Sequence, residues 1–415
     1  MIPLRVESAA HGGSCVAHAD GKVVFVHYAL PGETVEAEPR GRRGGAAFAA
    51  ATNVLEASPD RIEPRCPHFG YCGGCHWQHA AYATQLEIKR AVTAEAWARA
   101  GLRLPPETPV LGMAEPWRYR IRGEFEATGR PGAVRFGLHR LRSHSVFGLD
   151  VCPIHDERIE QAVLAFGQAV SELGIEGAQT LNLTAEPSGP GLLWDLRFRG
   201  DPRRRPPAEL ATRAADLLED GVALVDDSIS LEFWGLTFRV RSDTFVQTNY
   251  RQMLALYETA LDMLGAGPSV AVLDLYAGIG TIGLAVARAA GSVTSIEENP
   301  RAVALGRLAA RINGARNVHF LPGRVERALK GLRLGEHQAA ILDPPRAGCE
   351  PEALAELLRL HPQRIVYVSC EPSTHARDLA ALVRGGYRVR RAAVVDMFPQ
   401  TYHIESVALL ERSSA

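Results

Sequence analysis

Four cysteines have a spacing that is typical of a metal centre. Three of them form a C-x5-C-x2-C pattern at Cys66, Cys72 and Cys75. The two glycines between the last two cysteines would let the backbone wrap closely around a metal, and Cys152, which precedes a proline, could supply a fourth thiolate. Four thiolates suit either zinc or an iron–sulfur cluster, and the spacing leaves both open. The odd total of seven cysteines also indicates thiols or ligands rather than a disulfide framework.

A second set of reactive side chains stands at the ends of apolar, β-rich runs. Its members are Asp274, Glu297, Asp343 and Cys370. The carboxyl ends of parallel strands meet at one edge of an open sheet, where such sheets bind ligands. Two prolines directly after Asp343 stiffen the chain there. Cys370 is followed by Glu-Pro, and we interpret it as a nucleophile facing the cleft rather than as an ordinary buried cysteine.

Residues 272–283 run from a predicted strand through a glycine-rich turn into a helix and contain the pattern G-x-G-x-x-G. This pattern is formally a dinucleotide fingerprint. Asp274, ahead of the glycines, could accept from an ammonium or hydroxyl group, and Glu297 could accept from a ribose hydroxyl pair. The pattern therefore predicts a ligand that contains adenosine, and it fits NAD and S-adenosylmethionine equally well.

The elements that position these residues change character along the chain. Residues 1–58 read as short strands of a small OB-type barrel, residues 59–240 as a central, mostly β-rich domain, and residues 241–415 as the catalytic domain. Within the central domain the pattern is helical from 82 to 100, and we expect the segment 80–112 to pack on the catalytic domain. After residue 269, strands alternate with helices, near 270–275, 292–297, 318–322, 339–343, 364–369, 387–396 and 404–412. This predicts a doubly wound, mostly parallel α/β sheet whose last two strands form an antiparallel hairpin at an edge.

The charge balance is nearly neutral, with 46 Lys+Arg against 47 Asp+Glu. A generally positive surface for nucleic acid is therefore excluded. Residues 118–144 nevertheless hold seven arginines and two glutamates, interleaved with Tyr119, Phe125 and Phe136. This mixture predicts phosphate contacts and base stacking in a groove, with salt-sensitive RNA binding. Residues 1–14 lack a signal-peptide core and no long apolar run follows, so we expect a cytoplasmic protein that binds no membrane.

These motifs together resemble the family of RNA uracil-C5 methyltransferases, especially the iron–sulfur members that modify 23S ribosomal RNA. The likeness covers nearly the whole chain. It implies a class I S-adenosylmethionine-dependent methyltransferase fold with a Rossmann-like sheet of seven strands. It also implies that residues 1–58 form a TRAM barrel and that the central domain is an iron–sulfur domain. The residues that match the four [4Fe-4S] ligands are Cys66, Cys72, Cys75 and Cys152.

The resemblance also implies individual roles in the catalytic domain. The positions that match cofactor contacts are Gln247, Tyr276, Thr281, Glu297 and Asp343. Tyr276 and Thr281 differ from the phenylalanine and asparagine of some members. The segment around Cys370 is similar to the nucleophile motif, and residues 403–406 match the segment that carries the general base, Glu405. The resemblance assigns no role to Arg324, and we interpret His403 as structural.

The family mechanism would then apply to this chain. Cys370 would add to C6 of the uracil, C5 would take the methyl group of S-adenosylmethionine, and Glu405 would remove the C5 proton. We expect a monomer that acts on ribosomal RNA, with transfer RNA as the other substrate. The alternatives are an RNA cytosine-C5 methyltransferase, an iron–sulfur NAD oxidoreductase, and an RNA-binding iron–sulfur protein without catalysis.

Overall fold

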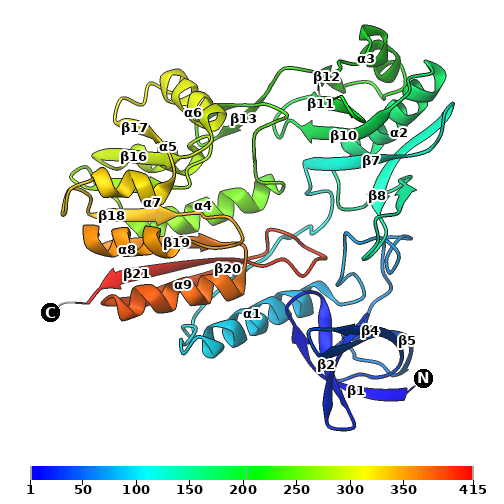
Figure 1. Ribbon diagram of the computed structural model, residues 1–415, viewed down its shortest axis with the longest axis horizontal. Coiled ribbons are helices and arrows are strands. Elements are labelled where there is room, and N and C mark those ends of the chain that lie inside the picture. Colours follow the sequence, from blue (N-terminus) through cyan, green and yellow to red (C-terminus); the bar gives the residue numbers. More distant parts are fainter. Residues whose placement is uncertain (1, 202, 414–415) are drawn as a thin grey trace.

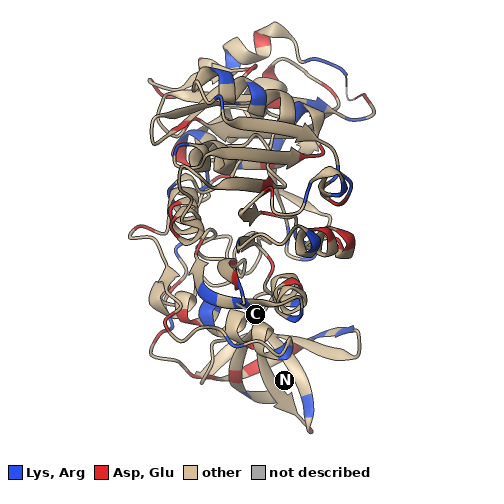
Figure 2. Cartoon of the chain, turned by 90° about the vertical axis from the view of Figure 1, so that its left-hand side faces the viewer, with Lys and Arg blue, Asp and Glu red and all other residues tan. Residues whose placement is uncertain are grey.

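The computed structural model describes residues 2–201 and 203–413. Their strands form a closed barrel, a six-stranded sheet, a two-stranded hairpin and an eight-stranded sheet (Figure 1). No helix in these residues is long and apolar enough to cross a membrane. Basic and acidic residues both occur in each part of the chain (Figure 2), which agrees with the nearly neutral sum of its charges.

The N-terminal strands close into the predicted barrel because β1 pairs with both β2 and β4. The strands are β1 (Ile2–Ala10), β2 (Ser14–Ala19), β3 (Lys22–His27), β4 (Thr34–Arg43) and β5 (Ala46–Glu56), in the order β1-β2-β3-β5-β4. The basic residues Arg40, Arg42 and Arg43 extend β4, and Gly41, Arg42 and Arg43 pair with β5. The turn is confined to Gly44 and Gly45, whose φ angles are both positive.

The central part is a six-stranded sheet in the order β12-β11-β10-β7-β8-β9. Its strands are β7 (Arg122–Arg130), β8 (Ala133–His139), β9 (Val146–Gly148), β10 (Ala178–Ala185), β11 (Gly191–Phe198) and β12 (Ala223–Val225), with helices α2 (Glu157–Glu172) and α3 (Ala208–Ala215). The prediction of base stacking by Tyr119, Phe125 and Phe136 is wrong. Their side chains lie in the core of this part, 4%, 0% and 1% exposed. The alternation of strand residues turns Phe125 and Phe136 inward, and Tyr119, which precedes β7, donates its hydroxyl to the carbonyl of Pro399.

The C-terminal sheet has the order β17-β16-β15-β18-β19-β21-β20-β6. The seven predicted strands are present as β15 (Ala271–Leu275), β16 (Ser292–Glu297), β17 (Val318–Pro322), β18 (Ala339–Leu342), β19 (Arg364–Ser369), β20 (Tyr387–Val395) and β21 (Glu405–Arg412). An eighth strand, β6 (Val110–Leu111), pairs with β20. The predicted hairpin of β20 and β21 is therefore not at the edge, because a segment from the first third of the chain covers it.

Helices cover both faces of this sheet. One face packs on α4 (Tyr250–Leu264), α5 (Thr281–Ala287) and α6 (Pro300–Ile312), together with the hairpin of β13 (Ile229–Phe233) and β14 (Leu236–Val240). The other packs on α7 (Val325–Ala328), the short helix η1 (Leu329–Gly331), α8 (Pro351–Leu360) and α9 (Pro372–Arg384). Helix α1 (Tyr82–Arg99) joins this second layer, where it lies beside α9 (Figure 1) and buries Trp97.

Candidate active site

A cavity of about 610 Å³ lies at the carboxyl edge of the C-terminal sheet. All seven residues predicted as catalytic or cofactor-binding line it, namely Gln247, Tyr276, Thr281, Glu297, Asp343, Cys370 and Glu405. Most of them follow or end the parallel strands β15, β16, β18 and β19, which is why residues spread over more than a hundred positions converge.

The glycine-rich turn after β15 brings α5 unusually close to the strand. A Cβ atom at Gly283 would overlap the Asp274 carboxylate, so only glycine allows this approach. Ser295 donates a 2.9 Å hydrogen bond to Asp274 Oδ2. Tyr276 has a φ of +62°, a strained conformation for a residue with a side chain, and it lines the cavity at the start of the turn.

Both carboxylate oxygens of Glu297 are held by backbone groups. The N–H of Gly278 donates to Oε2 at 2.9 Å, and the N–H of Asn299 donates to Oε1 at 2.7 Å. These bonds fix the orientation of the carboxylate at the end of β16 and leave lone pairs toward the cavity. An oriented acid at this strand end suits a ribose hydroxyl pair.

Strand register sets Cys370 opposite Glu405. Strands β19 and β21 are antiparallel, and Ser369 is the register partner of Ser406. One step beyond that pair, Cys370 follows Ser369 and Glu405 precedes Ser406, so the two side chains face each other across the end of the ladder. Burial raises the pKa of Cys370 to about 12, with a further increase from Glu405 and then Asp343.

Three buried carboxyl groups of the cavity have raised pKa values. Burial raises the pKa of Asp274 and of Asp343 to about 7. Repulsion from Glu297 contributes to the increase at Asp274, and repulsion from Asp274 contributes to the increase at Asp343. Burial and then Asp343 also raise the pKa of Glu405 well above its ordinary value, while Arg346 opposes this. Three acids at close quarters thus form a site that is poised to accept a positively charged ligand.

Sequence reasoning missed several side chains that line the cavity. Phe245 is 74% exposed, and Arg346 follows the two prolines after Asp343. Arg346 donates to His403 Nδ1 at 3.2 Å, and burial, followed by this arginine, lowers the pKa of His403 to about 3. Phe245 stands two residues before Gln247, and Arg346 stands three residues after Asp343. Their positions beside two predicted site residues are the sequence signal that could have indicated that they line the same cavity.

One of the arginines predicted to contact RNA instead holds the backbone just before Gln247. Arg122 donates to the backbone carbonyls of Ser242, at 2.8 Å, and of Thr244. Exposed basic groups do occur nearby: Arg140 lies over the Tyr71 ring, 4.5 Å from its centre, and Arg142 lies over the Phe48 ring at 5.2 Å. The Arg142–Phe48 pair joins the central part to β5 of the barrel, whereas the Arg140–Tyr71 pair lies within the central part. Together the two arginines form a surface suited to phosphates.

The four cysteines lie near one another. Burial raises the pKa of the Cys75 thiol, and Cys152, Cys72 and Cys66 raise it further, in that order. Within the described part of the chain, however, no group of three or more His, Cys, Asp or Glu side chains is placed to hold a metal ion. A single tetrahedral ion draws all its thiolates close together, whereas a [4Fe-4S] cluster takes each thiolate on a different iron.

N–H groups around these cysteines could support negative sulfur. The N–H of Gly74 donates to Cys72 Sγ at 3.4 Å, and the His155 ring Nδ1 lies 3.0 Å from Cys152 Sγ. Such hydrogen bonds are among the factors that tune iron–sulfur clusters. Thiolates with hydrogen-bond donors beside them could hold either kind of centre.

Known proteins share both the sequence and the fold. The tRNA (uracil-5-)-methyltransferase family model matches residues 217–413, and the TRAM domain model matches residues 1–38. An uncharacterized RNA methyltransferase of Halalkalibacterium halodurans is 34% identical over 99% of this chain and 97% of its own. A protein of Alkalilimnicola ehrlichii named 23S rRNA (uracil(1939)-C(5))-methyltransferase RlmD is 35% identical over 99% of this chain and 96% of its own.

The fold recurs in a solved structure. The crystal structure of the Pyrococcus abyssi tRNA (uracil-54, C5)-methyltransferase, in complex with S-adenosyl-L-homocysteine, matches with a TM-score of 0.75. The match covers 99% of this chain and 100% of that one at 20% identity, so the barrel, the central part and the catalytic sheet recur together. With relatives matched over its full length, the chain belongs to the family of S-adenosylmethionine-dependent RNA uracil-C5 methyltransferases.

Proposed function

We propose that the protein methylates C5 of one uridine in 23S ribosomal RNA, with Cys370 as nucleophile and Glu405 as base. The register of β19 and β21 carries this proposal, because it sets the two residues opposite each other in the cavity that also holds the five cofactor candidates. Ribosomal RNA is favoured because a relative named for a 23S rRNA uridine is similar over nearly the whole length of both chains.

The reaction divides one difficult step into easier ones. The Cys370 thiolate adds to C6 of the uracil, which forms the S–C6 bond and moves electron density onto C5. S-adenosylmethionine supplies an electrophilic methyl group on a positive sulfur. C5 would take this methyl group, so that the C5–CH₃ bond forms as the S–CH₃ bond breaks and S-adenosyl-L-homocysteine leaves. Glu405 then removes the C5 proton, the C5–C6 double bond re-forms, and the S–C6 bond breaks with its electron pair returning to Cys370.

Electrostatics would order these events. Burial raises the pKa values of Cys370, Asp343 and Glu405, so the free cavity disfavours all three anions. A positive ligand in the cavity stabilises each anion and lowers each pKa. The nucleophile and the base would therefore be activated after S-adenosylmethionine has bound, which prevents a reactive thiolate from forming in the free enzyme.

The substrate must present an unstacked base. Extrusion of a stacked uridine costs a few kcal/mol, which protein contacts to the flanking RNA must offset. The exposed pairs Arg140–Tyr71 and Arg142–Phe48 offer positive charge outside the cavity for that purpose. Truncation of both arginines should weaken RNA binding without changing the cofactor site.

Transfer RNA is the second candidate substrate, favoured by the family model that covers residues 217–413 and by the fold of the Pyrococcus abyssi enzyme. Methylation of defined 23S rRNA and tRNA transcripts, followed by mapping of the modified nucleoside, separates the two. The same analysis excludes or reveals 5-methylcytidine, the product of a cytosine-C5 methyltransferase.

We also propose that Cys66, Cys72, Cys75 and Cys152 hold a [4Fe-4S] cluster. Their mutual proximity, the N–H of Gly74 at Cys72 and the His155 ring nitrogen at Cys152 support this assignment. Anaerobically purified protein should contain about four iron and four sulfide per chain, with the absorption of a cubane cluster. One zinc per chain and no sulfide would overturn it.

Trapping tests the catalytic assignment. RNA with 5-fluorouridine at the target should form a covalent complex with the protein, because fluorine cannot leave as a proton does. Cys370→Ala should abolish this complex, visible as a band of lower mobility on a denaturing gel. A complex that forms equally well with Cys370→Ala would refute the nucleophile assignment.

A further inference from the structure

The segment between β20 and β21, residues 396–404 and here called the catalytic loop, leads directly into Glu405. It also carries Phe398 and His403, which line the cavity. The loop has no regular secondary structure, yet most of its residues are buried. Buried irregular backbone needs hydrogen-bond partners from elsewhere in the molecule.

Five consecutive carbonyl groups of the loop receive such partners from distant parts of the chain. The side chains of four residues each donate to one carbonyl: Gln252 to that of Asp396 at 3.1 Å, Asn249 to that of Met397 at 3.0 Å, Lys89 to that of Phe398 at 2.9 Å, and Tyr119 to that of Pro399 at 2.9 Å. The backbone N–H groups of His76 and Trp77 donate to the carbonyl of Gln400 at 2.8 and 3.0 Å. Helix α1, residues 66–80 (here called the cysteine segment) and the central part thus all contribute to the placement of this loop.

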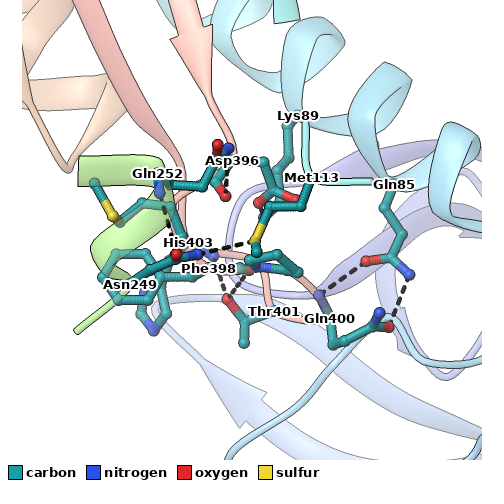
Figure 3. A network of polar contacts seen from close by, with 12 residues as sticks. Gln85, Lys89, Met113, Asn249, Gln252, Asp396, Phe398, Gln400, Thr401 and His403 are labelled. Carbon is teal, nitrogen blue, oxygen red and sulfur yellow. Dashed lines mark hydrogen bonds and ion pairs between the residues drawn. The ribbon is translucent and has the colours of Figure 1, made fainter. Parts of the chain in front are cut away.

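Gln400 is the most constrained residue of the loop. It is 2% exposed and has a φ of +69°, a conformation that persists only where neighbours impose it. Its backbone N–H donates to Gln85 Oε1 at 3.0 Å, and its side-chain Oε1 accepts from Gln85 Nε2 at 2.9 Å. Figure 3 shows the two amides facing each other, with Lys89 and Asp396 paired next to them.

The cysteine segment completes this arrangement. His76 and Trp77, whose N–H groups hold the Gln400 carbonyl, directly follow Cys75. Gln85 donates in addition to the carbonyl of Ala80 at 3.0 Å, which ties the end of the cysteine segment to α1. The amide of Gln85 therefore bridges two segments that both hold the catalytic loop.

We propose that Gln85 is a positioning residue, which acts through Gln400 to aim Glu405 at the C5 proton. The claim rests on the proposed function for the identity of the base, and on the hydrogen bonds alone for the placement of the loop. Loss of the Gln85 amide releases the strained turn, and residues 400–405 then sample other conformations. The cofactor side of the cavity, which lies on other strand ends, stays in place.

Hydrogen exchange tests the placement without any reaction. In Gln85→Leu, the amides of residues 400–405 should exchange at least about tenfold faster than in the wild type. The amides of β15 and β16 should be unchanged, which shows that the sheet stays folded. Glu87→Leu, an exposed position on the same helix, is the matched control and should exchange as the wild type does. Unchanged exchange at 400–405 in a folded Gln85→Leu protein would overturn the proposal.

Gln85→Glu keeps the proposal testable if the leucine variant does not fold. Glutamate retains an oxygen for the Gln400 N–H but loses the amide donors to Gln400 Oε1 and to Ala80. Exchange at 400–405 should then lie between the wild-type and leucine rates. A rate equal to that of the wild type contradicts the importance of the amide donors.

Kinetics tests the link to the base. Displacement of a catalytic group by a distant change costs on the order of 10²-fold in turnover. Gln85→Leu should show this loss in kcat, with the affinity for S-adenosylmethionine within about twofold of the wild type. With ordinary uridine RNA it should also accumulate the methylated covalent complex, since the step that stalls is proton removal. A loss of kcat without this complex overturns the link to Glu405, whereas absence of a wild-type complex with 5-fluorouridine RNA refutes the proposed function itself.

Discussion

The two sides of the cavity are built in different ways. On the proposed cofactor side, Tyr276, Glu297 and Asp343 lie at the ends of neighbouring parallel strands, and backbone groups nearby in the chain orient the Glu297 carboxylate. On the side of the proposed base, Glu405 follows a buried loop whose carbonyl groups are held by α1, the cysteine segment and the central part. If these roles hold, binding of the methyl donor depends on local structure, whereas placement of the base depends on most of the molecule.

This difference implies that distant changes should affect the two sides unequally. A disturbance at α1 or at the cysteines reaches the catalytic loop through direct hydrogen bonds. The hydrogen bonds to the Asp274 and Glu297 carboxylates instead come from residues within the segment 274–299, and none of them comes from α1. Methyl transfer and cofactor affinity should therefore respond separately to mutation.

The largest expected effect comes from the base itself. Glu405→Gln should lower turnover by about 10²- to 10⁴-fold, because an amide cannot take the C5 proton. The methylated covalent complex should accumulate, and cofactor affinity should change little. Quantification of complex and free product on denaturing gels, with isothermal titration of S-adenosylmethionine, checks both statements. Normal turnover would refute the role of Glu405, and a large loss of cofactor affinity would break the separation of the two sides.

A buried ion pair supports the base side. Lys89 and Asp396 are 1% and 0% exposed, and Tyr82 donates to the same aspartate at 2.6 Å. Lys89→Met should lower the free energy of unfolding by about 3–5 kcal/mol, because it leaves an unpaired buried carboxylate. The double variant Lys89→Met, Asp396→Leu should recover much of this loss. Urea unfolding of the wild type, the two single variants and the double variant measures the coupling energy of the pair. If the losses in free energy of unfolding of the two single variants simply add in the double variant, the pair contributes no interaction of its own.

The smallest expected effect concerns pH and the cofactor side. The pKa of Asp343 is raised to about 7, so its carboxyl must lose a proton before it can bind a cation. The ionised fraction of a group with this pKa rises from about 9% at pH 6 to about 50% at pH 7 and about 90% at pH 8. The affinity for S-adenosylmethionine should therefore rise about fivefold from pH 6 to pH 7, about twofold more by pH 8, and then level off. Asp343→Asn should flatten this rise. The effect of pH on folding stability has the opposite sign. Because the pKa of Asp343 is raised in the folded protein, its contribution to stability is fully present below its ordinary pKa and is lost as the pH rises through about 7. An affinity that is constant between pH 6 and 7 would contradict the assignment.

Local patterns made much of this architecture predictable. The seven strands of the C-terminal sheet followed from their apolar runs, and convergence of Asp343 and Cys370 followed from the rule for parallel strand ends. The failures involve pairings over long sequence separations. Strand β6 is two residues long and acquires its identity from β20, which lies far along the chain. The contact between Gln85 and Gln400 spans 315 positions, and neither glutamine stands in a recognisable motif.

Side-chain direction was the other limit. The strand alternation that includes Phe125 and Phe136 was visible in the sequence, but the face that would be covered by α2 was not. The same ambiguity applies to Lys89, which resembles any helical surface lysine until Asp396 is placed against it. Burial of a charge on one element can be recognised only when the partner element is known.

Strand β21 lies between β19 and β20 in the sheet, although the ribosome makes it after both. During synthesis, β19 and β20 therefore emerge without a shared neighbour, and the sheet remains divided until β21 inserts between them. The same insertion brings Glu405 beside Cys370 and draws the catalytic loop onto α1. A nascent chain can thus assemble its barrel and its cysteine segment early, while Cys370, the proposed nucleophile, gains Glu405 as its neighbour among the last events of folding.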